Sequence, residues 1–106
     1  MTGPAAQRII VYWRDIPAQV IVRQGRRAEK RELPERFIQA IDACAMAIGA
    51  KDSDAYLAEW RRGEPEACSA DLVAEADAAV ATIVDAYDID RLMQLIAQAG
   101  RIGAKA

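Results

Sequence analysis

The chain contains no histidine and no asparagine among its 106 residues, and only two cysteines. Without histidine it cannot build a Ser-His-Asp or Cys-His catalytic site, or a zinc site that uses histidine ligands. Cys44 and Cys68 lie far apart, so they form neither a CxxC pair nor a four-thiolate zinc site. No glycine-rich loop of GxxxxGK or GxGxxG type is present to hold nucleotide phosphates. We therefore expect no catalytic residue, no metal site and no cofactor.

The sequence also lacks any apolar run long enough to cross a membrane. Its first seven residues have neither the basic start nor the following apolar region of a signal peptide. Two separate cysteines fit a reducing compartment, where disulfides are rare. These features predict a cytoplasmic protein without a membrane partner.

Charge is divided unevenly along a chain that is 53% hydrophobic and 28% charged. Residues 1–31 contain seven basic and two acidic side chains, a net charge of +5, whereas residues 32–106 contain seven basic and fourteen acidic ones, a net charge of −7. A chain of this length has room for one hydrophobic core. The pattern predicts one domain with a basic first part and an acidic second part, and the overall acidity argues against a dedicated nucleic-acid binder.

Residues 8–23 contain the only concentration of β-branched and aromatic side chains, which is typical of strands. Pro17 cannot donate a backbone hydrogen bond and disfavours helix at the residue before it, so we expect a turn at Arg14–Pro17. Gly25 provides a second turn, after which residues 27–33 could return as a short third strand. The first part of the chain is thus predicted to be an antiparallel hairpin or a three-stranded meander.

The rest of the chain shows helical spacing of its apolar residues. We expect one helix between Pro34 and Gly49 and a second from Asp52 or Ser53 to Gly63, since glycine and proline end helices. A third is expected between Ser69 and Asp88, and a fourth from Asp88 to Gly100. The predicted fold class is α+β, with the N-terminal sheet packed against about four helices. Residues 1–7 are expected to be a flexible arm, residues 8–100 a single domain and residues 101–106 a flexible tail.

Several stretches resemble the small bacterial proteins of the virulence factor family, of alphaproteobacterial type. The similarity covers residues 8–62 well and the remaining helices loosely. It rests on the block Ile-Val-Tyr-Trp-Arg-Asp-Ile-Pro-Ala-Gln-Val at residues 10–20, and on Arg36-Phe37, Ala40-Ile41-Asp42, Ala45-Met46, Asp54-Ala55-Tyr56-Leu57 and Trp60. The family name describes a phenotype, and no catalytic motif accompanies it. Free-standing members occur beside genes of folate- and corrinoid-dependent one-carbon metabolism, so the resemblance implies an accessory protein to methyl-transfer enzymes.

Tyr12, Trp13, Arg14 and Asp15, at the end of the predicted hairpin, form the first candidate binding surface. Aromatic residues beside an arginine are typical of protein-binding hot spots. The alternative is structural, with Trp13 in the core and Arg14 and Asp15 in a turn salt bridge.

Five cations form the second candidate surface: Arg23, Arg26, Arg27, Lys30 and Arg31. They could bind an anion, such as a phosphate, a polyglutamyl chain or the RNA backbone. No aromatic residue lies among them to stack on bases, which disfavours RNA. The alternative is an edge strand that its charges protect from aggregation.

The remaining polar candidates favour structural roles. Acidic residues at helix starts fit surface and capping positions better than a metal or acid–base site; they are Glu32, Glu35, Asp42, Asp52, Asp54 and Glu59. Cys44 lies on an apolar helical stripe, and Cys68 lacks a nearby base. The leading interpretation is a non-enzymatic accessory protein whose partner is a corrinoid or folate methyl-transfer enzyme. Two alternatives stay open: a small RNA- or anion-binding module, and an enzyme acting on a folate-like substrate.

Overall fold

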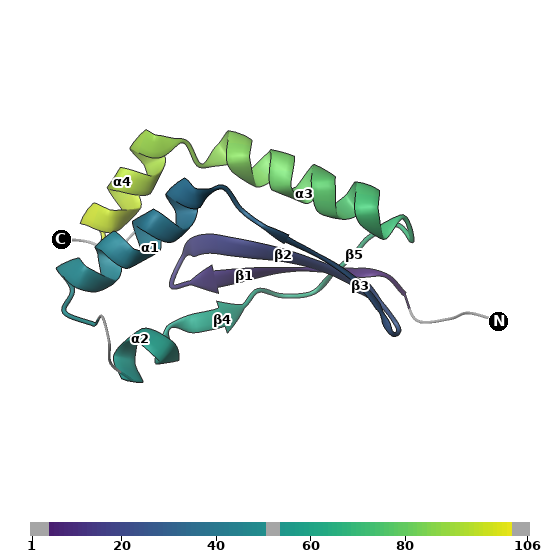
Figure 1. Ribbon diagram of the computed structural model, residues 1–106, viewed down its shortest axis with the longest axis horizontal. Coiled ribbons are helices and arrows are strands. Elements are labelled where there is room, and N and C mark those ends of the chain that lie inside the picture. The colour runs from purple at the N-terminus through teal and green to yellow at the C-terminus, as the bar shows by residue number, and fades with distance from the viewer. Residues whose placement is uncertain (1–4, 51–53, 103–106) are drawn as a thin grey trace.

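A computed structural model of the chain describes residues 5–50 and 54–102. The long strands form an antiparallel meander, and three helices, α1, α3 and α4, lie on one side of it, with α2 beside β4 (Figure 1). This arrangement confirms the predicted α+β class. The elements in chain order are β1 (Gln7–Trp13), β2 (Ile16–Gln24), β3 (Arg27–Glu32), α1 (Glu35–Ala47), α2 (Asp54–Ala58), β4 (Trp60–Arg62), β5 (Glu66–Ala67), α3 (Leu72–Ala86) and α4 (Ile89–Ala97).

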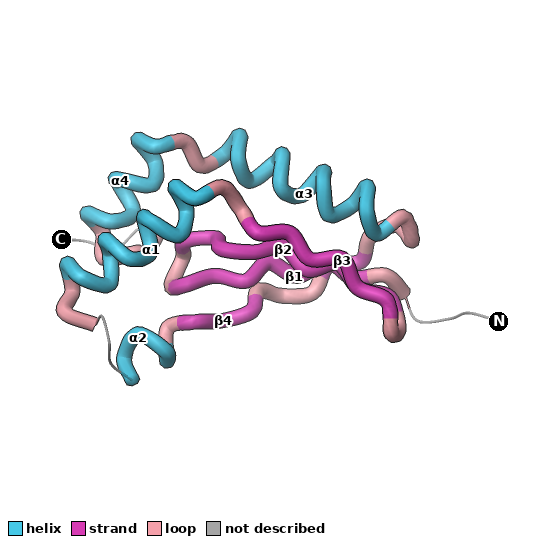
Figure 2. The backbone as a smooth tube through the Cα atoms, viewed as in Figure 1, coloured by secondary structure: helices cyan, strands magenta, loops and turns pink. Residues whose placement is uncertain are grey.

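The meander follows from the turn chemistry of the first 32 residues. Trp13 pairs with Ile16, so Arg14 and Asp15 form a two-residue turn in which Arg14 adopts a left-handed φ of 53°. The second turn contains Gly25, with a φ of 60°, and leads into β3. The sheet has the order β3-β2-β1-β4 (Figure 2), and the register also pairs β5 with β1. The third strand that the sequence suggested is therefore present.

The register assigns the strand residues to two faces. Arg8 lies opposite Val22, and Val20 opposite Arg31 on the next strand. Arg8 and Arg31 reach α3, where they pair with Glu75 at 3.8 Å and Asp77 at 3.1 Å. Residues of the other parity therefore point to the second face of the sheet. Along β2 and β3 these are Gln19, Ile21, Arg23, Lys30 and Glu32, and their partners on β1 are Gln7, Ile9 and Val11.

The core lies between the sheet and the helices. Trp13, Val20 and Val22 are wholly buried there, and α1 contributes the predicted stripe of Phe37, Ile41, Cys44 and Ala45. The helix α3 contributes Leu72, Ala76 and Ala79, and α4 contributes Leu92 and Leu95. Small alanines on α3 allow this helix to pack closely on β2. Among the described residues, no helix is both long and apolar enough to cross a membrane.

The second helix is shorter than predicted, because Trp60–Arg62 is a strand. Tyr56 and Trp60 have helical spacing, but α2 ends at Ala58 and β4 then pairs with the last three residues of β1. Without β4, the backbone groups on this edge of β1 would lose their hydrogen-bond partners. Gly63 continues the contact by donating its N–H to the Ile10 carbonyl at 2.7 Å. The two N-cap candidates Asp52 and Ser53 lie outside the described residues.

The ends of the domain differ from the expected arm and tail. Gln7 begins β1, and Ala6 is only 3% exposed and accepts a hydrogen bond from the Cys68 N–H. At the other end, Arg101 and Ile102 contact Glu59 and Asp15. The outer residues of the predicted arm and tail, 1–4 and 103–106, lie outside the part of the chain that the structure describes.

Candidate functional site

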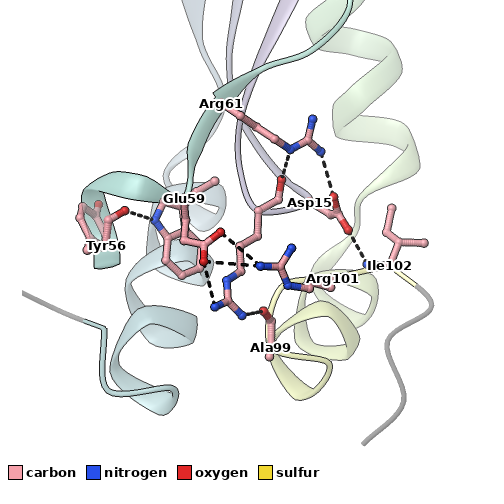
Figure 3. A network of polar contacts seen from close by, with 9 residues as sticks. Asp15, Tyr56, Glu59, Arg61, Ala99, Arg101 and Ile102 are labelled. Atoms are coloured by element: carbon pink, nitrogen blue, oxygen red, sulfur yellow. Dashed lines mark hydrogen bonds and ion pairs between the residues drawn. The ribbon is translucent and has the colours of Figure 1, made fainter. Parts of the chain in front are cut away.

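Trp13, one of the four residues of the predicted hairpin surface, lies in the core. Its side chain is 0% exposed, and its Nε1–H donates to the Tyr56 carbonyl at 2.9 Å (Figure 3). The Trp13 and Tyr56 rings also lie 5.7 Å apart. A buried indole with a satisfied donor stabilises the fold. Trp13 thus holds α2 against the sheet and has no surface to offer a partner.

Arg14 is held from two sides. Its Nη2 pairs with Glu59 Oε2 at 3.1 Å, and its Nη1 donates to the Ala99 carbonyl at 2.6 Å (Figure 3). Only 16% of the Arg14 side chain is exposed. Its Nε is buried and has no hydrogen-bond partner in the described structure. The side chain therefore joins the β1–β2 turn to the residue after α2 and to the end of the chain.

Asp15 makes a similar set of contacts on the other side of the turn. Its Oδ1 accepts from Arg61 Nη2 at 2.8 Å, and its Oδ2 accepts from the Ile102 N–H at 2.6 Å (Figure 3). Its own N–H donates to the Gly100 carbonyl at 2.7 Å. Arg101 closes the network by contacting Glu59 at 3.3 Å. We call this set the C-terminal clamp: Arg14, Asp15, Glu59, Arg61, Arg101 and the backbone of residues 99–102.

Tyr12 lies half-buried at the edge of the clamp. The Arg61 guanidinium carbon lies 4.4 Å from the centre of the Tyr12 ring, a cation–π distance. Burial, followed by the neighbouring Tyr87, raises the pKa of the Tyr12 hydroxyl above its usual 10.0, so it stays protonated at neutral pH. All four residues of the predicted surface are thus engaged within the chain. A partner would meet only the exposed parts of Tyr12, Arg14 and Asp15.

The five predicted anion-binding cations separate into two groups. Arg31 pairs with Glu29 at 2.8 Å and with Asp77 at 3.1 Å, and the hydrogen bond that it donates to Glu29 is the main cause of its raised pKa. The other four are exposed, and no hydrogen bond or ion pair engages their side chains in the described structure. They are Arg23, Arg26, Arg27 and Lys30, which we call the basic tip; they lie in the turn between β2 and β3 and in the adjoining ends of the two strands.

Neither cysteine has the features of a nucleophile. Burial raises the pKa of the Cys44 thiol, and burial with the nearby Glu75 carboxylate raises that of Cys68. Both groups are therefore thiols at neutral pH, whereas nucleophilic attack requires the thiolate. The described residues also contain no group of three or more cysteine, aspartate or glutamate side chains placed to hold a metal ion.

No local sequence pattern indicates the C-terminal clamp. Glu59, Arg61 and Arg101 are separated from the hairpin turn by more than forty residues, and no local pattern links them to it. From the sequence, Glu59 is predicted to be a surface carboxylate, and Arg61 is predicted to lie in the second helix; in the structure Arg61 lies in β4 instead. Only the pairing of β4 with β1 brings Glu59 and Arg61 to the turn.

Comparison with known proteins identifies one family. The family described as "Virulence factor" matches residues 11–96, which include all described helices and strands except the first residues of β1 and the last residue of α4. No curated protein and no solved structure matches the chain.

Proposed function

We propose that this chain, which belongs to the virulence factor family, is a non-enzymatic accessory protein that binds an acidic surface on a partner protein. The contact would be made by the basic tip, Arg23, Arg26, Arg27 and Lys30. The family name gives no chemistry, so the proposal is based on the distribution of paired and unpaired cations.

One observation carries the proposal: cations elsewhere are mostly used to hold the fold. Arg8, Arg14, Arg31, Arg61 and Arg101 form ion pairs, and Arg36 and Arg91 donate to backbone carbonyls. Among described residues the basic tip and Arg62 are the cations without such a contact. Four like charges at one tip repel each other, and an acidic surface relieves that repulsion.

The tip is also well placed for contact. The β2–β3 turn extends away from the helices α1 and α4, so a partner can approach it without meeting them (Figure 1). The remainder of the chain is acidic, which orients the molecule with its tip toward a negative surface. A contact of this kind speeds association and selects the partner more than it adds affinity.

As partner we propose a methyl-transfer enzyme of folate- or corrinoid-dependent one-carbon metabolism, in the cytoplasm. The support is the resemblance to the family, which implies a partner of this kind. The partner's identity is separate from the charge argument and is tested separately.

The test is affinity capture of the tagged full chain from its own cells, with each lysate divided into nuclease-treated and untreated halves. Arg26→Ala/Arg27→Ala should lose most of the captured partner, whereas Arg62→Ala/Arg91→Ala, which removes two charges elsewhere, should retain it. Capture of the wild type should also fall as salt is raised. Circular dichroism melting confirms that both variants fold.

Two outcomes would contradict the proposal, and a third would reject only the proposed partner. Equal capture by the two double variants would remove the role of the basic tip. Loss of the captured material on nuclease treatment would point to RNA, the alternative that shares the same cations. Capture of an enzyme unrelated to methyl transfer would keep the accessory function and reject the proposed partner.

A further inference from the structure

A cavity of about 380 Å³ lies where the sheet meets the start of α1. Val11, Gln19 and Glu32 are register partners across three strands, and all three line it. Glu35 and Ile38 contribute from α1, and Trp60 contributes from β4. The cavity is therefore built from four separate elements and the start of a helix, and its size lies in the range of small-molecule sites, about 300–1,000 Å³.

The charged side chains that line this cavity are all acidic. Glu32 and Glu35 contribute carboxylates, Gln19 contributes an amide, and no lysine or arginine lines the cavity. No ion pair within the described chain involves either glutamate, and no side-chain hydrogen bond within it involves Gln19. The acceptors at this place are thus available, whereas other acidic residues such as Glu59 and Asp77 are paired.

The other walls are apolar and aromatic. Ile38 is 42% exposed, although it is a large aliphatic residue, and it lies beside Val11 and Trp60 in the lining. The Trp60 ring meets Tyr56 edge-on, with centroids 6.0 Å apart, which restricts its orientation. A tryptophan face attracts cations, and apolar side chains favour a hydrophobic body.

We propose that this cavity binds a small organic cation: an amidinium, guanidinium or ammonium group carried on a planar or apolar body. The carboxylates of Glu32 and Glu35 would accept from the cationic N–H groups, and Gln19 would contribute a further acceptor through its carbonyl oxygen. Trp60, Ile38 and Val11 would contact the body. This site is distinct from the basic tip, and it selects ligands of the opposite charge.

Benzamidine and benzamide test the proposal, because they have similar planar shapes and differ in charge. Each is titrated into the full chain by isothermal calorimetry, and nitrogen–proton NMR spectra follow the Trp60 indole and Gln19 amide signals. We expect saturable benzamidine binding at least ten-fold tighter than that of benzamide, with shifts at both signals. Equal affinities, or shifts that spare Trp60 and Gln19, would overturn the proposal.

Matched variants separate the site from the general charge of the protein. Glu32→Gln/Glu35→Gln should weaken benzamidine binding at least ten-fold, whereas Glu64→Gln/Asp85→Asn, which removes the same charge from exposed positions outside the lining, should not. Equal weakening by both pairs would reject the site.

Glu35 also lies in the first turn of α1, so its substitution could affect the helix. A second variant therefore tests the cavity without changing Glu35. Ile38→Lys places a tethered ammonium group in the cavity wall and should abolish benzamidine binding while α1 is retained. Unchanged binding in this variant would contradict the proposal. Because the variants leave the basic tip intact, capture of the protein partner reports independently on the proposed function.

Discussion

Arg14 Nη2 lies 3.1 Å from Glu59 Oε2, and this pair joins a turn made early in the chain to the residue that follows α2. The same guanidinium group reaches the Ala99 carbonyl, so one side chain connects three segments. The Tyr12-Trp13-Arg14-Asp15 sequence therefore serves the fold. Its motif-like character reflects several intramolecular contacts made by adjacent residues.

Arg14→Ala should destabilise the domain by about 2 kcal/mol, because it leaves Glu59 and the Ala99 carbonyl short of a partly buried donor. Alanine has a Cβ, as arginine does, so the left-handed backbone at position 14 disfavours both residues. The difference in stability therefore reports on the arginine side chain. Urea denaturation measures it. Arg62→Ala, at an exposed cation without an ion pair among described residues, should change stability by less than about 0.5 kcal/mol. Equal effects of the two substitutions would mean that the clamp contributes nothing.

Trp13→Phe should cost about 2 kcal/mol, because it keeps an aromatic ring but removes the donor to the Tyr56 carbonyl and leaves a small void. Trp60→Phe is the matched change at a half-buried position, and it should lower the free energy of unfolding by less than Trp13→Phe does. Thermal and urea unfolding of both variants decide the comparison. A larger loss for Trp60→Phe would show that the aromatic contacts, rather than the buried indole, carry the stabilisation.

Gly49 and Gly100 both have positive φ, of 73° and 77°, but differ in their surroundings. Alanine at Gly49 would meet nothing within 4 Å, so we expect a loss of about 1 kcal/mol from the backbone conformation alone. At Gly100 a Cβ would lie 3.2 Å from Cys44 Sγ and 3.3 Å from Arg14, so the loss should be larger. Urea unfolding of Gly49→Ala and Gly100→Ala measures the difference, and equal losses would contradict close packing at Gly100.

Glu75 should give the domain a pH-dependent stability. The Ser69 N–H donates to its carboxylate at 3.0 Å, which holds the pKa of Glu75 below its ordinary value of 4.5. Since the folded state binds this proton less readily than the unfolded state, the stabilisation is complete above about pH 4.5 and is lost as the pH falls through the folded-state pKa. Glu75→Gln should therefore lower stability at neutral pH, and this deficit should shrink in acid. A constant deficit across an acid titration followed by urea unfolding would contradict this.

The meander was predictable because its information is local. β-Branched and aromatic residues fill β1 and β2, and Gly25 supplies the second turn. The high charge of β3 argues against a strand, because little of it can be buried. Its alternation explains the result, because Arg31 points toward α3 and pairs with Asp77 there.

The misassigned and missed features depend on contacts between distant residues. Trp60 has helical spacing from Tyr56, and only the free edge of β1 explains why it lies in a strand. The basic tip was visible as a charge cluster, but separating Arg31 from it requires the position of α3. The cavity could not be predicted, because Gln19, Glu32 and Trp60 meet only through the sheet order.

The C-terminal clamp has a consequence for how the protein is made. The Arg14 contact with Ala99 and the Asp15 contact with Ile102 span 85 and 87 residues. A ribosome synthesises the hairpin first, at roughly 5–20 residues per second. The turn must therefore wait several seconds, with its charged groups in water, until residues 99–102 emerge from the exit tunnel. The clamp consequently closes several seconds after its turn has been synthesised, because both contacts need residues that lie more than eighty positions further along the chain.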